Sequence, residues 1–149
     1  MSFVAKPTLR AATEADTEVI RDLLERNGLP TSDLSTARPE FVIASSAGRT
    51  IGIGALEPFG SVALLRSVAV ATEQRGCGTG RLIVEELERR ARTAGVNELI
   101  LLTLTARDFF ERLGYRAKER GQVTPPVLAS AEFRSLCPAS AVCLAKTLD

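Results

Sequence analysis

The feature that most constrains this chain is a glycine-rich loop at residues 74–81, QRGCGTGR. The loop follows an apolar, β-branched run, VALLRSVAVA, after two residues, and directly precedes a sequence with helical periodicity. Alternate glycines let the backbone turn its N–H groups toward one point, where the start of the next helix adds about half a positive charge. The loop therefore predicts a strand–loop–helix unit that binds a phosphate group.

The spacing of the glycines separates this loop from two other phosphate-binding sequences. A Walker A loop requires GxxxxGK[ST], and the loop contains no such lysine. A dinucleotide-binding fingerprint requires GxGxxG, whereas Gly76, Gly78 and Gly80 give GxGxG. A tight strand-to-helix turn that binds no ligand is the alternative interpretation of the same glycines.

The rest of the sequence predicts a single domain over residues 1–149, of the α/β class with a mixed, mostly antiparallel sheet. Strands dominate the first half, and strands alternate with helices in the second, which places helices on both faces of the sheet. We expect helices to begin at Thr13, at Thr79 or Gly80, at Ala106 and at Pro125, the last running through Phe133. The expected strands cover residues 8–12, 41–46, 50–57, 62–71, 97–105, 115–120 and 140–148. One helix face, expected to be solvated, carries Glu85, Glu86, Glu88, Arg89 and Arg92.

The composition excludes several classes of function. The chain has no histidine, which removes the usual general base and the commonest metal ligand, so no metal site is predicted. A net charge of +1 gives no electrostatic basis for binding nucleic acid or an anionic membrane. The N-terminal sequence lacks the pattern of a signal peptide, and no apolar run is long enough to span a bilayer. We therefore expect a soluble, cytoplasmic protein.

The three cysteines, Cys77, Cys137 and Cys143, form no paired framework, which predicts reduced thiols. Cys137 and Cys143 lie six residues apart, and two thiols without a third ligand are weak grounds for a metal site. Burial as small apolar groups is the expectation for this pair, with binding of a trivalent metalloid as the alternative. No chemistry is assigned to Cys77.

These residues resemble the GNAT superfamily of N-acetyltransferases. RGCGTG at 75–80 fits that family's Arg/Gln-x-x-Gly-x-Gly/Ala pattern, and the preceding SVAV fits the strand that hydrogen-bonds the pantetheine arm of coenzyme A. ARDFFERLGY at 106–115 is similar to the family's later helix-and-turn motif. The resemblance covers essentially the whole chain. It implies the GNAT acyl-CoA N-acyltransferase fold, with acetyl-CoA as cosubstrate.

The same resemblance implies roles for individual residues. Val68 and Val70, on either side of Ala69, would offer main-chain groups to pantetheine. The amide of Val70 would also polarise the thioester carbonyl, and a preorganised donor to a developing oxyanion contributes about 3–4 kcal/mol. The implied pyrophosphate-binding residues are Arg75, Gly76, Cys77, Gly78, Thr79, Gly80 and Arg81.

The residues that would move protons are less clearly marked. GNAT proteins commonly place a tyrosine, as the acid for the leaving thiolate, at the position that is Phe110 here. Tyr115 is the only tyrosine, and we consider it as the proton donor, with packing on the sheet and a hydroxyl at the surface as the alternative. Glu57 is the candidate general base, because it ends an alternating strand where Pro58 is expected to terminate it.

Arg66 interrupts an otherwise apolar strand, where an unpaired charge is costly. One interpretation pairs Arg66 with a structural carboxylate such as Glu57. The other assigns it to binding an anionic group of the substrate, since a guanidinium suits planar oxyanions.

The acceptor is expected to be the primary amine of a small molecule. An α-amino group, with a pKa of about 8, is deprotonated at much lower cost than a lysine amine at about 10.4. GALEPFGSVALLRSVAV, TARDFFERLGY and SLCPASAVCLAK resemble GNAT proteins associated with arsenic resistance (ArsN-type), which implies an organoarsenical or related amino-acid substrate. Two other classes stay open: an acyl-CoA-binding or sensing module without turnover, and a domain that binds no CoA. For the oligomeric state, a homodimer is one alternative.

Overall fold

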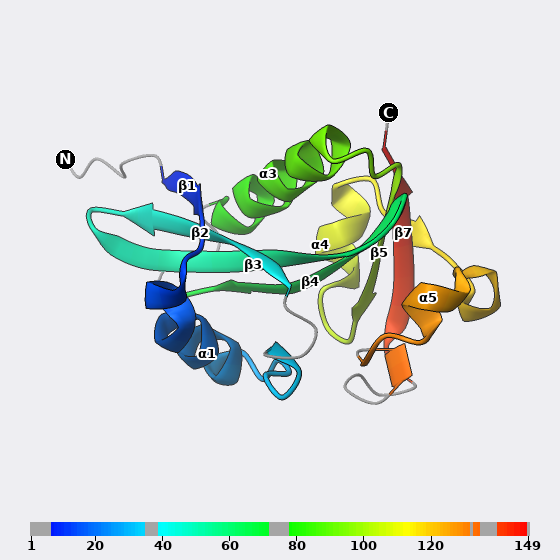
Figure 1. Cartoon of the computed structure of the whole chain (residues 1–149), viewed down its shortest axis with the longest axis horizontal. Helices are drawn as coiled ribbons and strands as arrows, with labels where there is room; N and C mark the ends of the chain where they lie inside the picture. Colours follow the sequence, from blue (N-terminus) through cyan, green and yellow to red (C-terminus); the bar gives the residue numbers. More distant parts are fainter. Residues whose placement is uncertain (1–6, 35–38, 72–77, 132, 135–139, 149) are drawn as a thin grey trace.

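Seven strands form one mixed sheet in the order β1-β2-β3-β4-β5-β7-β6 (Figure 1). The computed structural model describes residues 7–34, 39–71, 78–131, 133–134 and 140–148. Strands β4 and β5 pair in parallel, and the other neighbouring strands are antiparallel. The strands are β1 (Thr8–Ala11), β2 (Glu40–Ser46), β3 (Arg49–Phe59), β4 (Val62–Val70), β5 (Glu98–Thr103), β6 (Arg116–Ala117) and β7 (Val142–Thr147). The α-helices with described bounds are α1 (Thr17–Arg26), α3 (Thr79–Thr93), α4 (Arg107–Arg112) and α5 (Pro125–Leu128), with 3-10 turns at Glu14–Asp16 and Arg120–Gln122.

Helices cover both faces of the sheet, as the alternation of strands and helices predicted. Helix α3 lies on one face and α1 on the other (Figure 1). The apolar stripe of α3 packs into the main core cluster with β2, β3, β4 and α4, whereas α1 packs with Ile43, Ile53 and Ala69. No helix in the described part of the chain is long and apolar enough to cross a membrane.

Several element boundaries differ from the prediction. Strand β3 does not stop before Pro58 but continues to Phe59, and Pro58 pairs with Ala63 of β4. The described pairing of β2 with β3 begins at Glu40 and Leu56, so the proline lies beyond that ladder, where a missing N–H is tolerated. The strand expected at 115–120 is only the short edge strand β6, and the helix expected from Pro125 ends at Leu128 rather than at Phe133.

Two glycines of β3 allow α3 to lie directly on the sheet. A Cβ atom on Gly54 would come within 2.6 Å of Ile83 Cγ2 and 2.9 Å of Leu87 Cδ1. A Cβ atom on Gly52 would come within 2.7 Å of Ile83 Cδ1 and 3.2 Å of Thr79 Cγ2. Ile83 and Leu87 are fully buried, so neither side chain can turn into solvent. The position of the start of α3 therefore depends on these glycines.

Replacing Gly54 by alanine is expected to lower the free energy of unfolding by about 1–3 kcal/mol, the usual cost of overpacking a filled core. Chemical denaturation of the variant and the wild type measures this difference. Gly121→Ala is the matched control, because no described atom beyond its two chain neighbours lies within 4 Å of its Cβ position and its backbone is not left-handed. Equal loss of stability in both variants would contradict the packing argument.

Candidate active site

A cleft opens between β4 and β5, where the two parallel strands separate. Their pairing covers Val62–Leu64 and Glu98–Ile100, whereas β4 continues to Val70 and β5 to Thr103. The cleft has a volume of about 980 Å³. Its walls consist of residues 27–30, 65–70, 78–81 and 101–106, together with Phe109, Phe110 and Ala141.

Strand β4 bends beside this cleft. Its register with β3 shifts between Ile53 and Ala55, and Ser67 adopts a left-handed conformation with φ of 60°. Such a β-bulge kinks the strand and interrupts regular pairing, and it is often found next to active sites. Because Ser67 is not glycine, its conformation carries strain that the surrounding structure must support.

The bulge leaves the end of β4 with peptide groups that face the cleft. Ala71 donates its N–H to the carbonyl of Ile51 at 2.8 Å, so the peptide edge of Ala71 faces β3. Neighbouring residues of a strand present their peptide groups to opposite edges, so the amide of Val70 faces the side on which β5 has separated. Val68 and Val70 line the cleft, and Ala69 lies between them.

The N-terminus of α3 forms the adjoining wall. Gly78 is the residue before the helix, with φ of 81°, and Thr79, Gly80 and Arg81 form its first turn. The N–H groups of a first helical turn have no intrahelical partner and carry the positive end of the helix dipole, which makes this wall suitable for a phosphate group. Arg81 is exposed and pairs with Glu85 at 3.3 Å.

Gly80 brings three elements together. A Cβ atom here would lie 3.2 Å from Phe109 Cζ of α4 and 3.7 Å from Val70 Cγ2 of β4. The glycine thus lets the helix start approach both the strand and α4. The predicted residues Arg75, Gly76 and Cys77 lie outside the described residues, so the glycine loop is placed only from Gly78 onward.

Arg66 belongs to a buried ion-pair cluster, which agrees with the interpretation that pairs it with a structural carboxylate. Its Nη1 and Nη2 donate to the two carboxylate oxygens of Asp33 at 2.6 and 2.7 Å, and Nη1 also donates to Glu57 Oε1 at 3.0 Å. Arg66 is 3% exposed, Asp33 5% and Glu57 8%. A cluster of this kind satisfies charges that would otherwise be costly to bury.

The structure brings Glu57 next to Arg66 but not next to Val70. Glu57 pairs with Leu64 of β4, whereas Val70 pairs with Gly52 at the other end of β3. Arg66 belongs to the β4 wall of the cleft, although its side chain is 0% exposed, and Glu57 is not among the residues that line the cleft. Asp33 was missed by the sequence analysis, since it lies in a polar connection whose residues give no periodic signal.

Tyr115 is completely buried, and its hydroxyl donates to Glu88 Oε2 of α3 at 2.9 Å. Burial, together with the neighbouring Glu88 carboxylate, raises the pKa of this hydroxyl above its usual value. The expectation of a surface hydroxyl is therefore wrong. Tyr115 does not line the cleft, and its hydroxyl proton is donated to Glu88, so this geometry does not favour Tyr115 as the proton donor. Glu88 also accepts from Lys146 Nζ at 3.0 Å, so the helix face that carries it is not fully solvated as expected.

Phe110, which replaces the expected tyrosine, is buried and contacts both neighbouring aromatic rings. The centroid of its ring lies 4.9 Å from the ring centroid of Phe109 and 5.6 Å from that of Tyr115, in edge-to-face arrangements. Phe109 and Phe110 line the cleft. Their rings therefore connect the cleft with the cluster of Glu88, Tyr115 and Lys146, called the Glu88 cluster below.

The thiol of Cys143 is free and buried on β7, and burial raises its pKa. This confirms the expected apolar burial for Cys143, whereas Cys137 lies outside the described residues. Among the described residues, no group of three or more potential metal ligands lies together.

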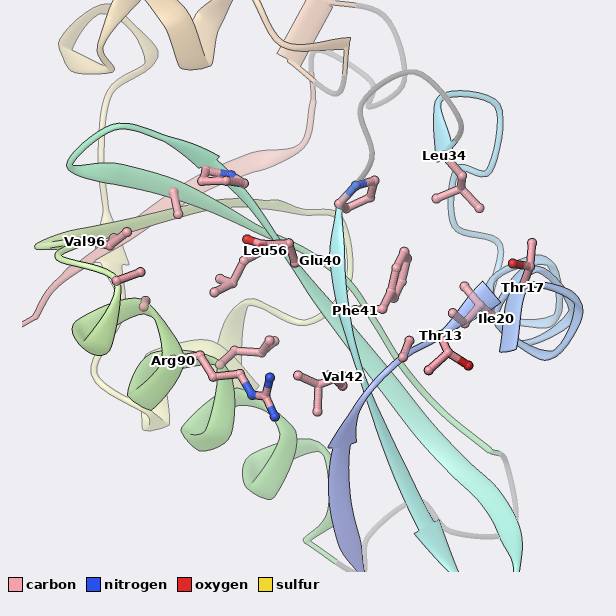
Figure 2. A pocket seen from close by; sticks show the side chains of 18 of the residues that line it. Thr13, Thr17, Ile20, Leu34, Glu40, Phe41, Val42, Leu56, Arg90 and Val96 are labelled. Atoms are coloured by element: carbon pink, nitrogen blue, oxygen red, sulfur yellow. The ribbon is translucent and has the colours of Figure 1, made fainter. Parts of the chain in front are cut away.

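A second hollow, of about 550 Å³, lies at the other end of the sheet. Figure 2 shows Phe41, Ile20 and Thr13 on one side of β2, with Arg90, Leu56 and Val96 on the other. This hollow includes neither the bulge nor the N-terminus of α3. The cleft between β4 and β5 is therefore the candidate active site.

Sequence comparison connects this geometry with a known family. Residues 37–117 match the family model described as "Acetyltransferase (GNAT) domain". The chain is 30% identical to the amino-acid acetyltransferase of Mycobacterium tuberculosis over 157 aligned positions, covering 97% of this chain and 85% of that protein. It is 40% identical to an uncharacterized N-acetyltransferase of Chlorobaculum tepidum over 82 residues, 54% of this chain, and spans about half (52%) of that relative. The chain belongs to the GNAT acetyltransferase family.

Solved structures agree with this assignment. Rv2747 from M. tuberculosis, solved in complex with CoA and NLQ, superimposes with a TM-score of 0.82 and 26% identity, covering 96% of this chain and 100% of that one. The N-acetylglutamate synthase from Neisseria gonorrhoeae, complexed with CoA and L-arginine, gives a TM-score of 0.82 at 20% identity. That match covers 97% of this chain and 34% of the other, and it shows a shared fold. The predicted GNAT fold is confirmed.

Proposed function

We propose that this protein transfers the acetyl group of acetyl-CoA to the primary amine of a small α-amino acid. The observation that carries the proposal is the edge of β4 beyond Leu64, where the described part of β5 no longer pairs with it; this edge runs along the cleft and ends beside the N-terminus of α3. An extended pantetheine arm can hydrogen-bond to such an edge, as an added strand would. The first turn of α3 then receives the pyrophosphate.

The chemistry requires few protein groups. The amine nitrogen attacks the thioester carbonyl carbon, the carbon–sulfur bond breaks, and CoA leaves with the electron pair as a thiolate. The amide of Val70, which faces the cleft, stabilises the oxyanion that develops on the carbonyl oxygen. A thiol with a pKa of about 8.5 leaves without an acid, so the reaction needs no contribution from Tyr115.

We assign the general base to Glu57, acting through a water molecule. Its Oε1 accepts from Arg66, which lines the cleft, and its side chain has no other hydrogen-bond partner among the described residues. The second carboxylate oxygen is thus able to accept a proton that a water molecule relays from the attacking amine.

An amino acid is favoured as the acceptor for two reasons. The α-amino group needs less help to lose its proton than a lysine side chain does. The M. tuberculosis relative at 30% identity is named an amino-acid acetyltransferase. The resemblance to arsenic-resistance GNAT proteins adds amino-acid-like organoarsenicals to the acceptors proposed.

Thiol release from acetyl-CoA tests the proposal, with the twenty amino acids, an organoarsenical amino acid and Nα-acetyl-lysine as acceptors. We expect at least one free α-amino acid to react tenfold or more faster than Nα-acetyl-lysine. Acetyl-CoA at a hundredfold excess over its Kd should add about 2.7 kcal/mol of stability, or roughly 5–11 °C in Tm. A thermal shift without thiol release for any amine would indicate a binding module. No shift at all would overturn the CoA site.

A further inference from the structure

A buried ion pair connects the chain segment after α1 with the bulged strand β4. Asp33 and Arg66 are 33 positions apart, and two parallel hydrogen bonds of 2.6 and 2.7 Å join their side chains. Such a bidentate pair fixes distance and orientation together, which a single contact does not. At 5% and 3% exposure the two side chains are shielded from water, which strengthens the interaction.

Asp33 belongs to the segment that forms one wall of the cleft. Residues 27–30 line the cleft, and Leu29 and Leu34 pack against the core cluster around α1. Most of this segment lacks regular secondary structure, so its shape depends on side-chain contacts rather than on a hydrogen-bonded ladder. The position of this wall therefore depends on the contact of Asp33 with β4.

Arg66 is held firmly at the other end of the pair. It immediately precedes the bulge residue Ser67, to whose Oγ its Nε donates at 3.3 Å, and it also contacts Glu57 at 3.0 Å. The guanidinium thus contacts the bulge itself, and Asp33 is tied through it to the part of β4 that carries Val68 and Val70.

We infer that Asp33 and Arg66 are a positioning pair, which fixes the segment 27–34, and with it the wall formed by residues 27–30, against the β4 bulge and thereby shapes the acceptor side of the cleft. The wall belongs to the α1 face, whereas the phosphate-binding helix start belongs to the opposite α3 face (Figure 1). The assignment of this wall to the acceptor rests on the proposed function. The positional coupling itself does not.

Asp33 is the better residue to change. Replacing Arg66 would leave the Asp33 and Glu57 carboxylates buried without their cation, which endangers folding altogether. Replacing Asp33 by alanine or asparagine leaves Arg66 paired with Glu57, so the burial of charge stays compensated. Asp22→Asn is the matched control, since among the described residues Asp22 forms only an exposed i,i+4 pair with Arg26 on α1.

Hydrogen exchange measured by mass spectrometry tests the coupling without any substrate. For Asp33→Ala we expect exchange at least tenfold faster in residues 27–34, with the interior of α3 unchanged, and a smaller effect for Asp33→Asn. Unchanged exchange in that segment, or equal acceleration throughout the protein, would overturn the inference.

Kinetics with L-glutamate as the probe acceptor test the consequence for the cleft. We expect Asp33→Ala to raise the KM for L-glutamate tenfold or more while the KM for acetyl-CoA stays within twofold. A merely structural role would lower the active fraction and leave both KM values unchanged, and this result would overturn the assignment to the acceptor side. If the wild type does not turn over any acceptor, the proposed function fails, and hydrogen exchange still decides on the positioning pair.

Discussion

Replacing Glu57 by glutamine is expected to lower kcat for acetyl transfer by about 10²–10⁴, the range associated with loss of a general base. The amide cannot accept a proton, so the amine has to reach the thioester already deprotonated. The KM for acetyl-CoA should remain unchanged, because the loop and strand that would bind the donor do not include Glu57. Initial rates of thiol release at saturating acetyl-CoA measure the effect.

The pH dependence of this deficit gives a second measurement. Below the pKa of its α-amino group most of the substrate is protonated, and the base is needed; above that pKa the free amine predominates. The difference between Glu57→Gln and wild type should therefore shrink as the pH rises past the α-amino pKa of the acceptor. The control is Glu40→Gln, an exposed carboxylate at the start of β2. A loss of less than threefold for Glu57→Gln would remove Glu57 from the reaction.

The parts of this protein that could be predicted from sequence are those that local interactions determine. The periods of two and of about 3.6 residues marked most strands and helices, and glycines between an apolar strand and a helix indicated a strand-to-helix turn. Gly78 and Gly80 do lie at the start of α3, beside the strand that carries Val70. These features depend on residues that are close in the chain.

The ion-pair cluster could be predicted only in part, because its partners are distant in sequence. Arg66 in an apolar strand indicated either an anionic group of the substrate or a structural carboxylate, for which Glu57, nine positions away across a hairpin, was the candidate. Asp33 forms the bidentate contact instead, and nothing in its polar surroundings distinguishes it from a solvated residue. A long-range contact of this kind follows from the tertiary fold, not from local pattern.

Glu88 was placed on a solvated face, although the sequence contained a signal for its burial. Val84, Leu87 and Ala91 occupy positions i, i+3 and i+7 of α3, and Glu88 at i+4 belongs to the same stripe. The prediction gave more weight to the charge of Glu88 than to its position in this apolar stripe. The pairing with Tyr115 and Lys146, from two later segments, is what makes the burial of a carboxylate possible here.

A substitution in the Glu88 cluster is expected to give the largest change in stability. Replacing Lys146 by methionine removes the cation from Glu88, whose side chain is only 7% exposed, while the Tyr115 hydroxyl continues to donate to that carboxylate. Breaking a buried ion pair from one side costs about 3–5 kcal/mol. We expect the lower end of that range, about 3 kcal/mol, because the Lys146 side chain is 24% exposed. For a domain of this size the loss corresponds to roughly 6–12 °C in Tm.

The double variant Lys146→Met, Glu88→Gln separates the unpaired charge from the loss of lysine contacts. The substituted amide would be neutral and still able to accept from the Tyr115 hydroxyl, so most of the lost stability should return. Thermal and denaturant unfolding of the wild type, both single variants and the double variant give the coupling energy. Because this cluster lies behind the aromatic rings rather than in the cleft, kcat per folded molecule should change less than threefold. If the double variant were no more stable than Lys146→Met, the cost would arise from the lost contacts of Lys146 with the Tyr115 ring and the carbonyl of Leu113, not from the carboxylate.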